Sequence, residues 1–274
     1  MTAPAARLAS IAIYPVKACR ATALQTAQLG EHGLEGDREW MVIRPDGRFL
    51  SQRSHPALAR VVPTLTPSGV RLACEGRASL AVDSAAVLAG APLEVRVWDD
   101  TLVACDAGAA AADWLSEVIG TPARLVRVAS GHGRRADHDY VGEREVPVAF
   151  ADGFPLLVCS LSSLAELNRR LPVAVPMERF RPNLVLDGLP AFAEDGIGSL
   201  RLGAVVLTLV KPCARCSVPG IDQITGQASS DPFPALKAFR YDPSVRGVTF
   251  GVNAVADGPP GARLEVGMTV TPGD

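Results

Sequence analysis

Aromatic residues are scarce in this chain. Phe, Trp and Tyr together account for 5% of its 274 residues. A chain of this length needs its few large rings for packing. We therefore expect Trp40, Trp98 and Trp114 to lie in the core rather than to serve as stacking platforms.

Neither sign of charge is in large excess. The 27 Lys and Arg residues and the 29 Asp and Glu residues give a formal net charge of -2. No overall field draws such a chain to nucleic acid or to an anionic membrane, so we expect neither as a partner. Any anion site must be a local cluster of cations.

Long apolar runs are also missing. The N-terminus lacks the apolar core of a secretory signal peptide, and no later run reaches the roughly 18 residues typical of a membrane span. The sequence therefore predicts a cytoplasmic protein that does not enter a membrane.

Metal-binding patterns are incomplete. The six cysteines are too widely spread for a disulfide framework, so we expect reduced thiols. The one Cys-x-x-Cys pair, Cys213 and Cys216, has no second pair, and the four histidines lack the i, i+4 spacing of a helical metal site. Because a structural zinc ion normally takes four N or S ligands, the sequence disfavours zinc.

What the chain does have is a globular composition with frequent turn residues. Hydrophobic residues make up 48% and charged residues 20%, while 25 Gly and 22 Pro interrupt short apolar runs. This pattern predicts a mainly β fold with some helix, of the α+β class, in two β-barrel-like domains.

The expected elements follow from local periodicity. Strands are predicted around residues 8–14, 38–44, 156–159, 183–186 and 205–210, and helices around 107–119 and 160–168. Residues 131–144 are polar, contain His132 and His138, and are predicted to form a mobile loop. The Ala-rich stretch after residue 105 marks the expected domain boundary.

The segment richest in reactive side chains is Lys211-Pro212-Cys213-Ala214-Arg215-Cys216. Neighbouring cations lower the pKa of a thiol and favour the thiolate, which attacks, exchanges or binds metal. A thioredoxin-like dithiol would begin a helix, which Pro219-Gly220 disfavours. A single thiolate on a redox metal needs only one sulfur if a cofactor supplies the other ligands. The spacing alone does not choose among zinc, dithiol and single-thiolate sites.

A second group is Phe180-Arg181-Pro182-Asn183, which precedes an apolar strand. Pro182 favours an extended Arg181, so Arg181 and Asn183 are expected on one side of the chain. A guanidinium and an amide on one face suit a phosphate or a planar heterocycle, although an isolated surface arginine more often forms a simple ion pair.

Four segments occur in order: Ile13-Tyr14-Pro15-Val16-Lys17, Gly36-Asp37-Arg38-Glu39-Trp40-Met41, Phe180-Arg181-Pro182-Asn183, and Lys211 to Cys216 with Asp222 and Thr225-Gly226. Together they resemble the MOSC family, in the branch with an N-terminal β-barrel domain that includes amidoxime-reducing proteins. The resemblance spans nearly the whole chain. It implies a MOSC N-terminal β-barrel domain over residues 1–115 and a MOSC domain over residues 116–274.

The resemblance also implies a cofactor and its contacts. Family members of this kind hold a molybdenum cofactor, a molybdopterin, between the two domains. The corresponding residues here are the metal ligand and catalytic residue Cys216, the phosphate contacts Lys17 and Arg38, the pterin contacts Arg181 and Asn183, and Arg215 beside the metal. Ala18 stands where relatives often have Ser, so one hydroxyl contact is expected to be absent.

The implied activity is the reduction of N-hydroxylated or related N-oxygenated small molecules. The chain ends at Asp274 without an iron–sulfur domain, so electrons are expected from a separate iron–sulfur or haem protein. The alternative is a non-catalytic module that carries molybdenum cofactor, or sulfur on Cys216.

Overall fold

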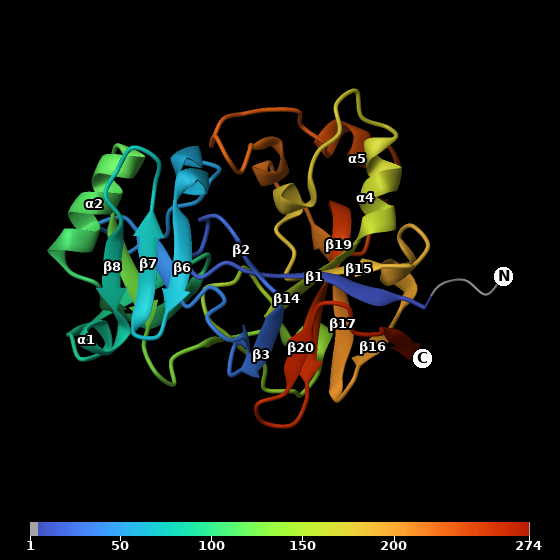
Figure 1. Ribbon diagram of the computed structural model, residues 1–274, viewed down its shortest axis with the longest axis horizontal. Helices are drawn as coiled ribbons and strands as arrows, with labels where there is room; N and C mark the ends of the chain where they lie inside the picture. The colour runs from blue at the N-terminus through green and yellow to red at the C-terminus, as the bar shows by residue number, and fades with distance from the viewer. Residues whose placement is uncertain (1–4, 274) are drawn as a thin grey trace.

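The computed structural model describes residues 5–273 and is mainly β with a few short helices, as predicted. Figure 1 shows two lobes side by side, one built around β6–β8 and α2, the other around the long strands β17 and β19 with α4 and α5. The chain passes between the lobes more than once. The first strand, β1 (Arg7–Ile13), belongs to the lobe that also holds the C-terminal strands.

The larger lobe is organised by a nine-stranded sheet. In spatial order its strands are β2 (Thr22–Leu24), β1, β15 (Leu184–Asp187), β14 (Leu156–Ser160), β19 (Gly247–Asp257), β17 (Val205–Ala214), β16 (Ser199–Leu202) and β21 (Thr271–Gly273), with β18 (Tyr241–Asp242) beside β19. β1 pairs antiparallel with β15, from Arg7 opposite Asp187 to Ile11 opposite Leu184. β14 and β15 are parallel, and the helix α4 (Leu161–Asn168) follows β14 directly.

Alternating apolar residues explain how β1 is held. Leu8, Ile11 and Ile13 are buried in one core with side chains from β14 to β17. Burying a leucine or isoleucine side chain stabilises the fold by about 1.5–3 kcal/mol. The first strand is thus an integral part of the larger sheet.

Within the described residues, the smaller lobe contains two sheets and two α-helices. Its strands are β5 (Trp40–Ile43), β11 (Arg124–Val128), β10 (Asp100–Asp106) and β9 (Pro92–Val97) in one sheet, and β6 (Val62–Thr66), β7 (Gly69–Ala73) and β8 (Leu80–Asp83) in the other. The helices are α1 (Ser84–Leu88) and α2 (Ala109–Ile119), which ends at the left-handed Gly120. The short 3₁₀ helix η1 (Pro56–Arg60) precedes β6.

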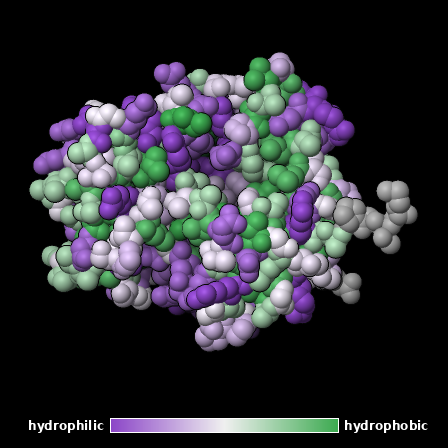
Figure 2. Space-filling model, viewed as in Figure 1, coloured by the Kyte–Doolittle hydropathy of each residue, from purple (hydrophilic) through white to green (hydrophobic). Residues whose placement is uncertain are grey.

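Smaller elements complete the chain. They are β3 (Thr26–Gly30), β4 (Gly33–Leu34), β12 (Arg134–Arg135), β13 (Pro147–Val148), β20 (Arg263–Glu265), α3 (His138–Val141), α5 (Phe233–Phe239), and the 3₁₀ helices η2 (Met177–Phe180), η3 (Ala193–Gly196) and η4 (Val218–Gly220). Figure 2 shows hydrophilic side chains gathered around a hollow between the two lobes. The predicted boundary after residue 115 stays a prediction, but strand pairing crosses it, since β11 joins β5 and β10.

Two expectations about local structure were wrong. Residues 131–144 contain β12 and α3 rather than one open loop, and Arg134 ties them to the chain by donating to the backbone oxygen of Ala151 at 2.6 Å. Of the tryptophans, Trp40 is fully buried and Trp114 half-buried, but Trp98 is 47% exposed. Trp98 occupies a hairpin tip, where the strands leave no core to enter.

Candidate active site

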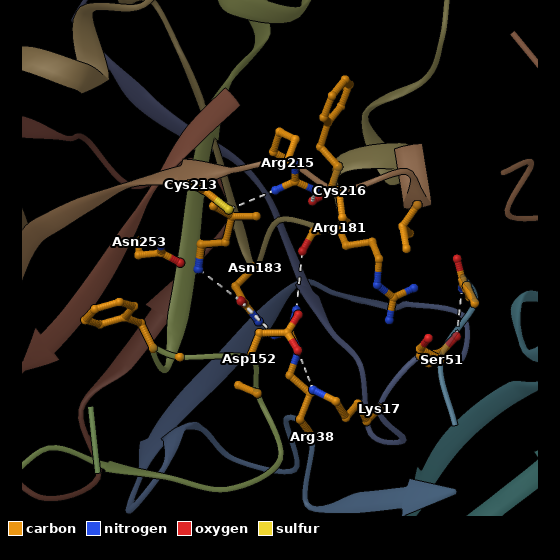
Figure 3. A pocket seen from close by; sticks show the side chains of 18 of the residues that line it. Lys17, Arg38, Ser51, Asp152, Arg181, Asn183, Cys213, Arg215, Cys216 and Asn253 are labelled. Atoms are coloured by element: carbon orange, nitrogen blue, oxygen red, sulfur yellow. Dashed lines mark hydrogen bonds and ion pairs between the residues drawn. The ribbon is translucent and has the colours of Figure 1, made fainter. Parts of the chain in front are cut away.

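One pocket between the lobes brings together all six predicted site residues. Its lining includes Lys17, Arg38, Arg181, Asn183, Arg215 and Cys216. They come from loops after β1, before β5, before β15 and after β17, which are far apart in sequence (Figure 3). The pocket is therefore assembled by tertiary structure rather than by one local motif.

Lys17 is buried and held by two acceptors. Its Nζ donates to the backbone oxygen of Phe150 at 2.7 Å and to Asp152 Oδ1 at 2.6 Å. Burial lowers the pKa of Lys17, and the carboxylate of Asp152 offsets part of that effect. Desolvation opposes ionisation of Asp152, but the Lys17 ammonium together with the guanidinium groups of Arg38 and Arg53 outweighs it and holds the pKa of Asp152 well below its usual range.

Asn183 positions Arg38. The Asn183 Oδ1 accepts from Arg38 Nη1 at 2.8 Å and from the Leu157 backbone N–H at 3.1 Å, while its Nδ2 donates to the Ala12 oxygen at 3.2 Å. Asp37 Oδ2 accepts a second hydrogen bond from Arg38 Nη1. Asn183 is buried, and three protein groups engage its amide. It acts on the pocket mainly through Arg38.

The ring of Tyr14 packs against two guanidinium groups. Arg38 Cζ lies 4.4 Å and Arg181 Cζ 4.2 Å from the centroid of the Tyr14 ring. The Tyr14 hydroxyl donates to the Pro182 oxygen at 3.1 Å, and burial raises the pKa of Tyr14 above its ordinary value. Tyr14 is thus a neutral platform that holds two positive groups at the pocket wall.

The backbone of Arg181 is not extended, so that expectation was wrong. Arg181 has φ 59 and ψ 44, in the left-handed region, and closes η2. Ala18 and Arg38, which also line the pocket, have φ values of 67 and 52. Positive φ is uncommon for residues other than glycine, and such residues concentrate at functional sites. Tertiary contacts therefore outweigh the preference for an extended backbone that Pro182 gives to Arg181.

A turn after η4 joins the larger lobe to the smaller one. Asp222 Oδ1 accepts from the backbone N–H groups of Ile224 and Thr225, both at 2.9 Å, and from Thr225 Oγ1 at 3.2 Å. Gly226 has φ +69, and a Cβ there would lie 2.8 Å from the backbone oxygen of Pro56 in the other lobe. This close approach explains the Thr225-Gly226 pair found in the sequence.

A pair of buried glutamines links this turn to the smaller lobe. Gln52 and Gln223 exchange amide hydrogen bonds of 2.9 and 2.8 Å. Arg181 Nη1 donates to Gln223 Oε1 at 3.1 Å. The Gln52–Gln223 pair thereby helps to fix the guanidinium of Arg181.

The two cysteines of the Cys-x-x-Cys pair have different environments. Cys216 is exposed at the pocket, whereas Cys213 is half-buried and its Sγ accepts from Arg215 Nη1 at 3.0 Å (Figure 3). Arg215 Nη2 donates to the Phe180 oxygen at 2.8 Å, but the buried Arg215 Nε has no partner among the described residues. The accessible thiol is therefore Cys216, beside a guanidinium with unused hydrogen-bonding capacity.

Lys211, in contrast, faces away from the thiols. Its Nζ lies 3.9 Å from the centroid of the Tyr140 ring, in α3. Neither His132 nor His138 lines the pocket. Across residues 5–273, no group of three or more His, Cys, Asp or Glu side chains is arranged to hold a metal ion.

The charge of the pocket fits an anionic ligand. Within the described part of the chain, five cationic residues and one carboxylate, Asp152, contribute to its lining; the cations are Lys17, Arg38, Arg53, Arg181 and Arg215. Such a local excess of cations attracts phosphate groups in a protein of near-neutral charge. An anionic cofactor that brings its own metal ligands and needs one protein sulfur matches these residues.

Sequence reasoning missed several residues that shape this pocket. Tyr14 and Asp37 were inside the recognised segments but had no assigned role, and Gln223 lies beside Asp222. Asp152 and Gln52 lie in segments with no chemical motif. Their roles follow from contacts across more than a hundred residues of sequence, as in the pair of Gln52 and Gln223.

Comparison with known proteins agrees with this architecture. Residues 5–122 match the MOSC N-terminal beta barrel domain, and residues 145–274 match the MOSC domain. The chain belongs to the MOSC family. The family assignment and the mainly β fold expected from sequence are confirmed.

Three relatives illustrate the range of this MOSC protein's similarities. It is 32% identical to human mitochondrial amidoxime-reducing component 1, over 87% of this chain and 74% of the relative, and 31% identical to bovine mitochondrial amidoxime reducing component 2, over 86% and 73%. It is 30% identical to rice molybdenum cofactor sulfurase, over 97% of this chain but 35% of that larger protein.

The lengths of the helices bear on membranes. None of the helices within residues 5–273 is long and apolar enough to cross a bilayer. The predicted cytoplasmic location stays a prediction, and two of these relatives are named as mitochondrial.

Proposed function

We propose that the pocket between the lobes binds a molybdenum cofactor. In this proposal Cys216 is the protein ligand of the metal and Arg215 lies beside it. Lys17 and Arg38 bind the terminal phosphate, and Arg181 contacts the pterin. Asn183 supports these cofactor contacts by accepting a hydrogen bond from Arg38, which fixes the Arg38 guanidinium. The observation that carries the proposal is that one exposed thiol and five cationic side chains share one pocket.

We further propose that the protein, with its cofactor bound, is a reductase of N-hydroxylated small molecules. The reaction consumes two electrons and two protons, breaks the N–O bond, and releases an amine or amidine and water. The cofactor supplies the redox-active metal, and the chain supplies ligation, orientation and a cationic wall. Similarity to two amidoxime-reducing components supports this substrate class.

The electrons are proposed to arrive one at a time from a separate iron–sulfur or haem protein. The second candidate is a non-catalytic carrier of molybdenum cofactor, or of sulfur on Cys216. The similarity to a molybdenum cofactor sulfurase over nearly the whole chain favours retaining this alternative.

The test is cofactor analysis followed by turnover. Protein purified from a host that makes the cofactor is expected to contain molybdenum and pterin in equal amounts, and to reduce a simple amidoxime with a reduced viologen as donor. Cys216→Ser should reduce turnover by at least a hundredfold while the thermal unfolding curve stays unchanged. Cys213→Ser, the matched control, should retain most of the activity.

Other outcomes decide between the candidates. Stoichiometric cofactor without amidoxime reduction would favour the carrier. Full activity in Cys216→Ser, or purified protein without molybdenum and pterin, would contradict the proposed function.

A further inference from the structure

Trp98 is an exposed aromatic residue in a strained backbone conformation. It forms, with Asp99, the two-residue tip of the hairpin between β9 and β10, where Asp100 pairs with Val97. Its φ is 56, and its exposed fraction is 47%. Hairpin tips with positive φ favour Gly, Asn or Asp, and for a bulky residue this conformation is an outlier. Strain combined with exposure of a large apolar ring points to a contact outside the chain.

Four exposed arginines surround this tip. Arg44, Arg48 and Arg96 line the same surface depression as Trp98, and Arg53 Cζ lies 4.8 Å from the centroid of the Trp98 ring. None of the four forms an ion pair with another described residue. We call Arg44, Arg48, Arg53, Arg96 and Trp98 the basic patch.

The backbone itself brings two of these charges together. Arg48 and Arg96 are bridge partners on neighbouring segments, and like charges in that arrangement repel each other. Among residues 5–273, Asp99 is the only carboxylate residue in the lining of the depression. The chain as a whole carries a formal charge of -2, so the basic patch is a local feature. An acidic partner would relieve the repulsion.

The basic patch adjoins the pocket. Phe49 lines both, and its ring stands edge-on to Trp98 with the centroids 5.1 Å apart. The Phe49 ring also contacts Lys17, whose Nζ lies 5.1 Å from the ring centroid. A single aromatic side chain therefore connects the patch with the proposed phosphate contact. A redox partner docked here would lie close to the cofactor site, and electron transfer falls steeply with distance.

We infer that the basic patch is the docking surface for an acidic electron-donor protein, with Trp98 as its central anchor. This inference rests on the proposed function, because it takes the pocket as the place where electrons are used. Redox encounters are typically small and transient, and opposite charges accelerate them. An aromatic anchor within a ring of arginines is a common composition for the centre of a protein interface. Each docking event would deliver one electron, so two are needed per N–O bond broken.

The test compares protein and artificial donors in the cofactor-loaded protein. The donor proteins are an acidic [2Fe–2S] ferredoxin and the soluble domain of an acidic b-type cytochrome, each kept reduced by its own reductase. The variants are Arg48→Glu with Arg96→Glu, and Trp98→Gly, which also removes the strain. The matched control is Arg201→Glu with Arg263→Glu, two exposed arginines without ion pairs on β16 and β20.

Wild type is expected to turn over with at least one acidic donor, at a rate that falls as ionic strength rises. The double reversal at Arg48 and Arg96 should lower kcat/KM for that donor by about tenfold or more. Trp98→Gly should lower it several-fold with less dependence on salt. All variants should keep wild-type turnover with reduced viologen, and the control should match wild type with both donors.

The inference is overturned if viologen supports turnover but neither acidic protein does, or if the control loses as much protein-donor activity as the patch variant. The inference would also be overturned if the patch substitutions weakened binding of a single-stranded oligonucleotide but left turnover with the protein donors unchanged. If the cofactor-loaded wild type does not turn over even with reduced viologen, the proposed function itself is contradicted.

Discussion

At the scale of single residues, a buried carboxyl outside the pocket gives the clearest pH prediction. Glu194, in η3, is fully buried, and its Oε1 accepts from Ser163 Oγ at 2.7 Å. Its Oε2 has no partner among the described residues. Burial raises the pKa of Glu194, although the Ser163 hydroxyl opposes the shift.

The sign of the effect follows from the raised pKa. The folded state binds the proton of Glu194 more tightly than the unfolded state does. Its contribution to the free energy of unfolding is therefore complete below the ordinary Glu pKa. This contribution is lost as the pH rises through the pKa that Glu194 has in the folded state. Glu194→Gln should remove this part of the pH dependence, measured by urea unfolding from about pH 4 to 8. If the free energy of unfolding depended on pH in the same way in wild type and in Glu194→Gln, the assignment would be contradicted. Glu143→Gln, at an exposed position, is the control.

Residues also show where prediction from sequence stopped. Lys17, Arg38, Arg181, Arg215 and Cys216 could be selected because their segments form ordered motifs, and the structure places them in one pocket. The conformation of Arg181 could not be predicted, because the local bias from Pro182 competes with hydrogen bonds to Gln223 and Arg38. The roles of the five selected residues at the cofactor remain predictions.

At the scale of elements, the turn that begins at Asp222 is held mainly by one carboxylate. Backbone N–H groups, that of Thr225 foremost, hold the pKa of Asp222 below its usual value. Asp222→Ala removes three local hydrogen bonds and the 3.1 Å ion pair with Arg179. We expect amide hydrogen exchange in residues 220–229 to accelerate about tenfold or more.

The control for this experiment is Asp242→Ala. Asp242 caps a similar turn by accepting from the backbone N–H and the hydroxyl of Ser244. It should accelerate exchange only near its own turn. Unchanged exchange at residues 220–229 in Asp222→Ala would show that other contacts, such as those of Arg20 to Gln223 and Ile224, suffice.

Elements were predicted well where the signal was local. The strand expected at residues 8–14 is β1 (Arg7–Ile13), and the helix expected at 107–119 is α2 (Ala109–Ile119). The partner of β1 could not be predicted, because the alternation of apolar residues fixes which face is buried but not which strand lies beside it. Residues 131–144 were misread because their order comes from contacts with other segments.

At the scale of the whole molecule, the two lobes depend on each other. A fragment of residues 116–274 would lack β1 and leave the core-facing side chains of β15 and β14 uncovered. We expect this fragment alone to give a poorly dispersed NMR spectrum and no cooperative thermal transition. Co-expression with residues 1–115 should restore a folded complex. A fragment 116–274 that unfolds cooperatively by itself would contradict this expectation.

The position of β1 has a consequence for how the protein is made. During synthesis, Leu8, Ile11 and Ile13 leave the ribosome long before β15, since about 180 residues separate Arg7 from its partner Asp187. At translation rates of about 5–20 residues per second, this segment waits on the order of ten seconds or more. Throughout that interval an apolar strand edge is open to other nascent chains. Early binding by a chaperone would protect it until the rest of its sheet has been translated.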